Sequence, residues 1–230
     1  MHLFDILFPK FCVGCGKIGA YFCASCIKLI RPILQSETIC PVCERAAIDG
    51  QTHPFCKTRY SLDGLICFFH YKNPLKNAIK KIKYQFVSDI VVPCVDLSTQ
   101  IWNLEKSYNH LLNEAVLIPS PLHISRKRFR GFNQAELIGK QLANTYKIPL
   151  HDDMIQRIRV TTPQVEVRNR KNRVMNMKGV FMIKRPIHYD IPHTVLFVDD
   201  VFTTGATMKE ATKVLKHAGV TCVWGIALAR

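Results

Sequence analysis

Residues 194–219 read TVLFVDDVFTTGATMKEATKVLKHAG, and this stretch decides the fold. Its first five residues are apolar or β-branched, which suits a buried strand and is too short a run for a buried helix. The carboxylates of Asp199 and Asp200 follow, and then a loop of small residues, 203–207. From Met208 onward apolar residues recur at helical spacing until a glycine, which commonly ends a helix. The predicted order is therefore strand, acidic pair, loop, helix.

This order of elements predicts a phosphate site. A loop that opens a helix leaves backbone N–H groups without intrahelical partners, and the helix dipole adds partial positive charge there. Such a place binds phosphate. Gly205 would let the backbone approach the anion closely, and the hydroxyls of Thr203, Thr204 and Thr207 would add donors.

The acidic pair predicts a second part of the ligand. It follows the strand at its carboxyl end, where open α/β sheets bind ligands. Carboxylates repel phosphate, but they accept hydrogen bonds from sugar hydroxyls and hold Mg²⁺. Asp199 and Asp200 beside a phosphate loop therefore indicate a ligand with a phosphate at one end and a diol at the other, as in a ribose 5-phosphate.

Residues 195–207, VLFVDDVFTTGAT, resemble the phosphoribosyl-pyrophosphate (PRPP) motif of type I phosphoribosyltransferases. The resemblance implies an α/β fold of that type, a mostly parallel sheet flanked by helices. It also implies that the acidic pair holds the ribose 2- and 3-hydroxyls, that the loop holds the 5-phosphate, and that Mg²⁺ accompanies PRPP. The PRPP-binding residues expected on this basis are Asp199, Asp200, Thr203, Thr204, Gly205, Ala206 and Thr207.

Charge and composition indicate which kinds of partner the protein has and where it is located. The chain has 230 residues, and 32 Lys and Arg against 17 acidic residues give a formal net charge of +15, which indicates anionic partners such as phosphorylated metabolites or nucleic acid. No apolar run approaches the ~18 residues of a membrane span. Residues 1–9 are apolar but too short for a secretory signal. We therefore expect a cytoplasmic protein without a transmembrane segment.

The cysteines predict metal sites. Seven of the ten lie between Cys12 and Cys56, and cysteines without a secretion signal favour metal ligands over disulfides. They form three C-x-x-C pairs, and a fourth pair is mixed, His53-Pro-Phe-Cys56. Four such turns supply ligands for two tetrahedral Zn²⁺ ions. The expected ligands are Cys12, Cys15, Cys23, Cys26, Cys40, Cys43, His53 and Cys56.

The spacing leaves the pairing of these turns open. We expect sequential pairing, with the first four ligands on one ion and the last four on the other, but a cross-brace of alternating pairs has the same spacing. His53 has the alternative interpretation of a surface histidine in a loop. With all positions filled the sites would be structural. We therefore predict a zinc-ribbon-like domain over residues 1–60 and a phosphoribosyltransferase-like domain over residues 61–230.

The segment 61–114 predicts one strand and two helices. Residues 65–71 suit a strand, residues 75–86 carry an apolar helical stripe that includes Phe86, and residues 90–104 suit another helix. Five lysines between Lys72 and Lys83 lie roughly opposite the apolar stripe. They are either a solvated face or a ridge for nucleic acid.

Most of the excess charge lies in the next segment. Thirteen basic and four acidic residues, a balance of +9, fall between Leu122 and Lys178. After a short strand at 115–118, Asn133 would cap a helix. A transferase needs cations beside the pyrophosphate leaving group, and arginine suits phosphate through its bidentate fork. The arginines that we expect to bind the pyrophosphate are Arg126, Arg128 and Arg130.

A second basic cluster runs over residues 157–173. It has weak periodicity and is predicted to be a long loop that includes Thr161. Near all this charge, Tyr84, Phe86, Phe129 and Phe132 could stack nucleic-acid bases or belong to the core.

Together these motifs resemble the ComF family of competence proteins. PSPLH at 119–123, RKRFRGFNQ at 126–134, NRKNR at 169–173 and the PRPP motif stand behind an N-terminal cysteine array. The resemblance implies a part in natural transformation, with uptake and processing of single-stranded DNA in the cytoplasm beside a competence helicase. Some members of the family are linked to the use of DNA as a nutrient.

Two functions remain open on the sequence alone. The chain is either an Mg²⁺-dependent phosphoribosyltransferase with an unknown acceptor, or a non-catalytic DNA-processing factor that binds PRPP. Purine-salvage transferases for hypoxanthine and guanine carry an acidic residue where this chain has Thr203, which argues against that substrate class. The cysteine-rich segment could form the hood that selects the acceptor.

Overall fold

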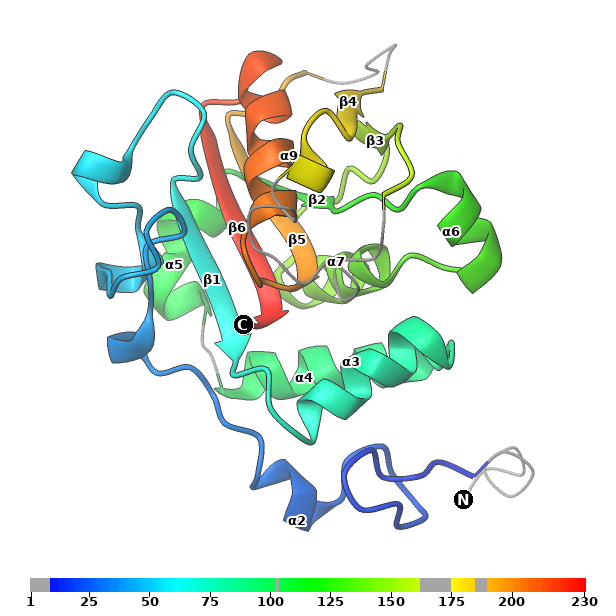
Figure 1. The fold of residues 1–230 in the computed structure, drawn as a ribbon. Helices are drawn as coiled ribbons and strands as arrows, with labels where there is room; N and C mark the ends of the chain where they lie inside the picture. Colours follow the sequence, from blue (N-terminus) through cyan, green and yellow to red (C-terminus); the bar gives the residue numbers. More distant parts are fainter. Residues whose placement is uncertain (1–8, 102–103, 162–174, 185–189) are drawn as a thin grey trace.

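The computed structural model describes residues 9–101, 104–161, 175–184 and 190–230 (Figure 1). Most of the predicted basic loop, residues 162–173, lies outside the described residues, as do residues 1–8 of the apolar N-terminal stretch. Among the described residues, no helix combines the length and the apolar character needed to cross a membrane.

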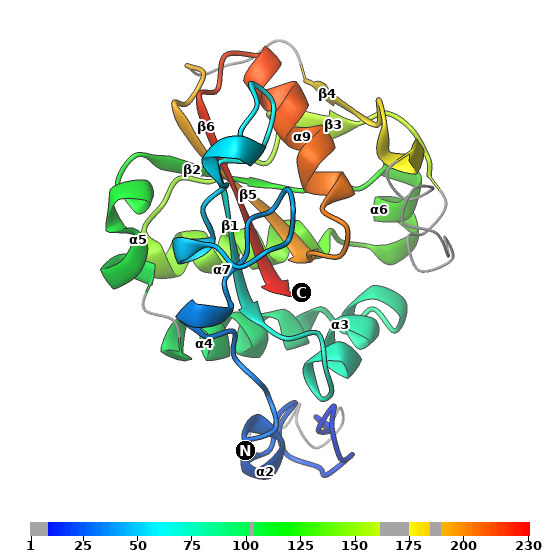
Figure 2. The same ribbon diagram turned by 60° about the vertical axis from the view of Figure 1, so that its left-hand side comes forward.

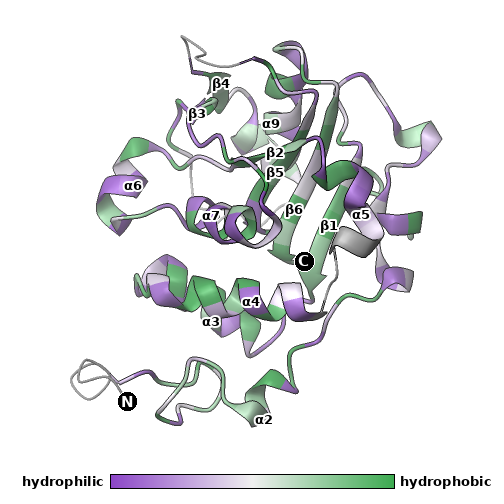
Figure 3. Ribbon diagram, turned by 180° about the vertical axis from the view of Figure 1, so that it is seen from behind, coloured by the Kyte–Doolittle hydropathy of each residue, from purple (hydrophilic) through white to green (hydrophobic). Residues whose placement is uncertain are grey.

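The centre of the protein is a four-stranded sheet in which every pair of neighbours is parallel. The order of its strands is β1 (Gly64–Phe69), β6 (Cys222–Ala229), β5 (Thr194–Val201) and β2 (Ala115–Pro119). The strands are nearly continuous apolar runs, as expected for parallel strands that are covered on both faces. Figure 3 shows this as hydrophobic colour along the strands.

Two hydrophobic clusters cover the two faces of the sheet. Helices on the first face, with α3 near the carboxyl ends of the strands, are α3 (Leu75–Tyr84), α4 (Val91–Ile101), α5 (Leu104–Leu112) and α7 (Gln134–Tyr146). On the second face lie α9 (Ala206–His217) and an antiparallel pair, β3 (Ile155–Arg157) with β4 (Phe181–Ile183). Figure 2 shows α9 and α7 on opposite sides of the sheet. This confirms the predicted α/β fold and is consistent with a phosphoribosyltransferase-like architecture.

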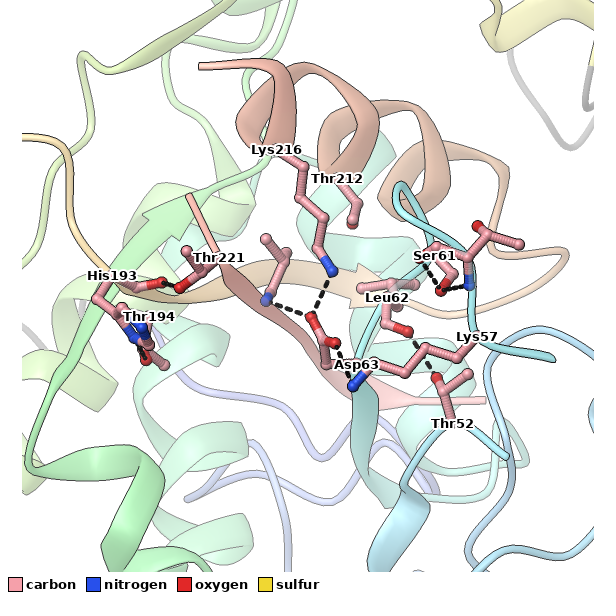
Figure 4. A network of polar contacts seen from close by, with 12 residues as sticks. Thr52, Lys57, Ser61, Leu62, Asp63, His193, Thr194, Thr212, Lys216 and Thr221 are labelled. Atoms are coloured by element: carbon pink, nitrogen blue, oxygen red, sulfur yellow. Dashed lines mark hydrogen bonds and ion pairs between the residues drawn. The ribbon is translucent and has the colours of Figure 1, made fainter. Parts of the chain in front are cut away.

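The N-terminal segment lies along β1 and is mostly irregular. Its short helices are α2 (Ala24–Ile27), η1 (Gln35–Glu37), η2 (Ile48–Gly50) and η3 (Pro54–Cys56), and η4 (Ser88–Ile90) lies further on. The amide of Ile33 donates to the carbonyl of Phe68 at 2.9 Å, and Gln51 bridges Gly64. Beyond this contact, Asp63 pairs with Lys57 of the segment and with Lys216 of α9 (Figure 4). The segment is thus attached to both ends of β1 through residues 32–33 and 51, whereas its first part meets α3, where Asn77 donates to the carbonyl of Val13.

Several predicted elements differ in their bounds. The strand predicted over 194–198 continues to Val201, because β6 runs beside it as far as Ala229. The helix predicted over 75–86 ends at Tyr84, and Phe86 was wrongly placed in its apolar stripe: Phe86 has φ 60° and is 41% exposed. The chain turns out of the helix there, so this ring leaves the core.

The basic segment after β2 contains a helix that the sequence analysis missed. Helix α6 (Ile124–Arg130) ends at Gly131, whose φ of 82° is left-handed, and α7 begins after Asn133. The side chain of Asn133 accepts from the amide of Ala135 at 3.1 Å, which confirms the predicted cap. Arg157, predicted to be in a loop, is the last residue of β3.

Candidate functional site

The order of the strands sets the place of the candidate site. The chain leaves β5 for α9 on one face of the sheet, and it leaves β2 through α6 for α7 on the other face. Since β5 and β2 are neighbours, the connections diverge between their carboxyl ends. Such a switch point is where open α/β sheets bind ligands. The residues gathered here follow β5 and β2, as the motifs predicted.

A pocket lies at the end of β5 and the start of α9. Gly205 precedes the helix with φ 67°, a left-handed conformation in which glycine carries no strain. A Cβ atom on Gly205 would come within 2.8 Å of the Phe202 ring, so the loop depends on a glycine at this position. The pocket is lined by Asp199, Val201, Phe202, Thr203, Gly205, Ala206, Thr207 and Met208.

The two carboxylates do not lie side by side. Because β5 continues through them, successive side chains point to opposite faces of the sheet. Asp199 faces the side of α9 and lines the pocket, whereas Asp200 faces α3 and is 5% exposed. Thr204 is also buried, and its hydroxyl oxygen accepts from the amide of Ala206 at 3.4 Å. The pocket therefore contains five of the seven predicted residues.

Asp199 is held in an environment that disfavours its charge. Burial and the neighbouring charge of Asp200 together raise its pKa to about 7, against the lowering effect of Lys83. One oxygen of Asp199 accepts from the amide of Asp200 at 2.9 Å. A carboxyl group with a pKa near neutrality in a pocket is typical of a functional site.

Asp200 is paired with a lysine that the sequence analysis placed among the lysines opposite the apolar stripe. Lys83 of α3 is instead turned inward, with its side chain 23% exposed and its Nζ 2.8 Å from both Oδ1 and Oδ2 of Asp200. Burial lowers the pKa of Lys83, but the charge and hydrogen bond of Asp200, together with the charges of Asp199 and Tyr71, outweigh burial and raise this pKa, so the lysine is protonated. The Oδ2 atom of Asp200 is buried and makes no hydrogen bond within the described part of the chain.

The three predicted arginines divide between two sides of α6. Arg126 and Arg130 are half-buried and four residues apart, so they lie on one side of the helix, while Arg128 is exposed on another. Arg130 is attracted by Asp200 and hydrogen-bonds to Gln134. The structure thus brings two of the three arginines toward the carboxyl ends of the strands.

Arg157 joins these arginines from β3. Arg126 donates to the carbonyl of Thr161 and Arg157 to its hydroxyl, so both guanidinium groups meet at this threonine. Burial and the nearby charge of Arg126 lower the pKa of Arg157 to about 10, with the charge of Asp199 acting in the opposite direction. The first residue of the second basic cluster therefore lies beside the first cluster.

Aromatic side chains collect on the surface next to the arginines. The rings of Phe86 and Phe129 meet edge to face, with centroids 5.5 Å apart, and Phe129 is 81% exposed. Tyr84 at the end of α3 is also largely exposed. Phe132, by contrast, packs against the first hydrophobic cluster. Three of the four predicted aromatics are therefore accessible to a partner.

The first cysteine cluster fits a tetrahedral metal ion. The ligand atoms of Cys12, Cys15, Cys23 and Cys26 lie within 4.8 Å of one another. The sulfurs of Cys15 and Cys23 are 3.7 Å apart, close to the about 3.8 Å expected across a tetrahedral zinc with Zn–S bonds of about 2.3 Å. Burial raises the pKa of Cys12, but hydrogen bonds from backbone amides, among them that of Cys23, lower it to about 6.

The second cluster fits a metal ion as well. It consists of Cys40, Cys43, His53 and Cys56, again within 4.8 Å of one another. The Cys43 sulfur is 3.4 Å from Nδ1 of His53, near the about 3.6 Å expected for zinc bound by one sulfur and one nitrogen. Nε2 of His53 lies 2.9 Å from the carbonyl of Ala46, a contact that fixes the ring and leaves Nδ1 for a metal. The grouping of the eight ligands is sequential.

Comparison with known proteins supports the family resemblance, although no protein-family model matches the chain. Competence protein F of Haemophilus influenzae is 33% identical over 177 residues, which cover 75% of this chain and 76% of that protein. DNA utilization protein YhgH of Salmonella typhimurium is 28% identical over 214 residues, or 90% of this chain and 89% of the relative. Competence protein ComFC of Bacillus subtilis is 24% identical over 208 residues, or 86% of this chain and 78% of the relative. The chain therefore belongs to the competence protein F (ComF) family.

Proposed function

We propose that this protein binds PRPP at the loop after β5 and acts on single-stranded DNA in natural transformation or DNA utilization. The observation that carries the first part is the pocket at the switch point, which combines a glycine loop, the start of α9 and Asp199. The names of its relatives, competence protein and DNA utilization protein, support the second part.

The loop suits the 5-phosphate of the ligand. The first backbone N–H groups of α9 have no partners within the helix, and the left-handed Gly205 lets an anion come close to them. Threonines 203 and 207 line the same pocket and offer hydroxyl groups. Asp199 would accept a hydrogen bond from a ribose hydroxyl, and Asp200 lies on the other side of the strand end.

The arginines suit the pyrophosphate. Arg126, Arg130 and Arg157 come from two elements beside the pocket and are partly buried, where a charge is screened less by salt than at the surface. Mg²⁺ bound with PRPP would neutralise further phosphate charge. This concentration of fixed cations favours a second candidate function, in which the site transfers the phosphoribosyl group to an acceptor and stabilises the leaving pyrophosphate.

Structural zinc is part of the proposal. Both clusters have four ligands at suitable distances, and a filled tetrahedral site leaves no position for a substrate. The proposal also includes the division into a zinc-binding segment, residues 1–60, and a phosphoribosyltransferase-like segment, residues 61–230.

The aromatic and basic surface suits single-stranded DNA. Exposed aromatic rings on which bases can stack are those of Tyr84, Phe86 and Phe129. Arg128 is exposed on the same helix as Phe129. Stacking on aromatic rings next to cations is the usual way in which proteins hold single strands. A role in the cytoplasm beside a competence helicase agrees with this surface and belongs to the same proposal.

The first part is tested by isothermal titration calorimetry of zinc-loaded protein with PRPP and Mg²⁺. We expect one binding site, with affinity lost in Asp199→Asn and kept in Asp190→Asn, which changes an exposed carboxylate elsewhere. Equal affinities in both variants, or no binding by the unaltered protein, would contradict the assignment. Pyrophosphate release over a panel of bases and amines then separates the two candidate functions, since only the transferase releases it.

A further inference from the structure

We infer that Lys83 determines ligand specificity at this site: its ammonium group pairs with Asp200 and binds the C1 pyrophosphate when PRPP is present. The inference rests on the proposed function and assigns a role to a residue outside the PRPP motif. It predicts that Lys83 separates PRPP from ribose 5-phosphate, which lacks the pyrophosphate.

The first argument is the position of Lys83. Its Nζ lies 2.8 Å from both carboxylate oxygens of Asp200, at the carboxyl end of β5, although the lysine comes from the last turn of α3 more than a hundred residues earlier. The carboxylate of Asp199 and the phenol of Tyr71 also act on its charge. A protonated lysine is thus fixed beside Asp200, the carboxylate that would accept from a ribose hydroxyl.

The second argument is that Asp200 can accept a further donor. Oδ2 of Asp200 is buried and makes no hydrogen bond in the described residues, and its described contact is the ion pair with Nζ of Lys83 at 2.8 Å. A carboxylate oxygen can accept more than one donor, so this atom has capacity for another hydrogen bond. A ribose hydroxyl would supply that donor. Binding would then relieve Asp200 of its dependence on the lysine.

The third argument is the geometry of the sugar. C1 of a ribose is bonded to C2, so a pyrophosphate on C1 comes close to whatever carboxylate accepts from the 2-hydroxyl. Two groups of like charge at that separation repel each other strongly in a partly buried site. A lysine head on a flexible four-carbon stem can lie between them and contact both. Arg130 is a second cation near Asp200 and also hydrogen-bonds to Gln134, so Lys83 would share the pyrophosphate with it.

The test compares two ligands on matched zinc-loaded variants by calorimetry, both with and without added Mg²⁺. Lys83→Met removes the charge, Lys83→Gln removes it while keeping a donor for Asp200, and Lys83→Arg keeps it. Lys80→Met, an exposed lysine of the same helix, is the control. We expect Lys83→Met and Lys83→Gln to weaken PRPP binding at least tenfold and to change ribose 5-phosphate binding less than threefold. Lys83→Arg should retain most of the preference for PRPP, and Lys80→Met all of it.

The possible results separate this inference from the function on which it rests. If the unaltered protein binds neither ligand, the proposed function is wrong and this inference fails with it. If it binds PRPP but both uncharged variants lose the two ligands equally, Lys83 only supports the fold. Unchanged PRPP affinity in the uncharged variants overturns the inference too. If Lys83→Met does not fold, the same criteria apply to Lys83→Gln, and its thermal unfolding shows whether the fold is intact.

Discussion

The carboxylate of Asp63 lies 2.7 Å from Nζ of Lys216, and this ion pair joins the residue before β1 to α9 (Figure 4). The two side chains are only 10% and 8% exposed. The same Asp63 accepts from the amide of Val223 at 2.9 Å and lies 3.3 Å from Nζ of Lys57. One carboxylate thus connects the N-terminal segment, β6 and the helix that follows the phosphate loop.

Asp63→Ala should lower the free energy of unfolding by about 3–5 kcal/mol, because it leaves the buried charge of Lys216 without a partner. Urea denaturation of zinc-loaded protein measures this change. The control is Lys140→Ala, which removes an exposed partner of Glu136 and should cost no more than about 1 kcal/mol. Equal effects of the two substitutions would show that the Asp63 network contributes no more than a surface pair.

The metal content should be two zinc ions per chain, measured by atomic emission. Because the clusters are sequential, Cys15→Ser should remove one ion and Cys43→Ser the other, with the remaining site unaffected. Cys222→Ser, which changes a cysteine outside both clusters, should keep two. Well under two ions in the unaltered protein would contradict the eight-ligand assignment, and loss of both ions in a single variant would contradict independent sites.

The motifs predicted the kinds of element correctly, but not how far β5 extends. The run of apolar residues in 194–198 suggested that the strand stops before the carboxylates. The extension depends on β6, whose Ala227 and Ala229 pair with Asp199 and Val201, and this pairing is a long-range property. It decides the site, because it sends Asp199 and Asp200 to opposite faces.

Lys83 shows a second limit of local patterns. Five lysines between Lys72 and Lys83 suggested one solvated side, but Lys83 directly follows the buried Ile82 and lies four residues after the buried Ile79. That spacing places it at the border of the apolar face, which was the available signal. Its partner on β5 is far away in sequence, so the ion pair itself could not be predicted. The cysteine ligands needed no such information, because their spacing is local.

Asp199 should make stability depend on pH. Its pKa in the folded protein, about 7, lies above the value of 3.8 for an unperturbed aspartate, so the folded state binds more protons between these values. The protonated Asp199 therefore stabilises the fold at low pH, and this contribution is lost as the pH rises from about 4 to about 7. Because asparagine does not titrate, only the unaltered protein loses this contribution. The free energy of unfolding of Asp199→Asn minus that of the unaltered protein should therefore increase from pH 5 to pH 7 and then level off. A difference independent of pH would show that Asp199 is ionised throughout, and Asp190→Asn serves as control.

Gly205→Ala should abolish PRPP binding while the protein remains folded, because the new methyl group would meet the Phe202 ring and distort the loop. The matched control is Gly219→Ala. Gly219 also has a left-handed φ, but its added methyl group would find Ile191 at an ordinary 3.6 Å. Both substitutions should cost about 1–2 kcal/mol of stability, and only the first should affect calorimetric binding. Full PRPP affinity in Gly205→Ala would exclude this loop as the phosphate site.

Phe129→Ala should weaken binding of a fluorescent oligodeoxythymidine by about 1–3 kcal/mol, the value of one base stacked on an aromatic ring. The matched control is Phe55→Ala, which removes an even more exposed ring from the cysteine-rich segment. Affinity should fall steeply with salt, since bound cations release counterions from the phosphates, and Arg128→Gln should reduce this slope. Anisotropy titrations that show equal losses for both phenylalanines, or no salt dependence, would contradict a DNA surface at α6.

The central claim is that the loop after β5 holds the phosphate of a phosphorylated ribose, and a crystal structure of the zinc-loaded protein with PRPP and Mg²⁺ tests it most directly. We predict the 5-phosphate within hydrogen-bonding distance, about 2.7–3.2 Å, of backbone N–H groups in residues 203–207. The pyrophosphate should point toward Arg126, Arg130 and Lys83. A ligand bound only elsewhere at saturating PRPP, with Asp200 and the loop unchanged, would contradict the claim.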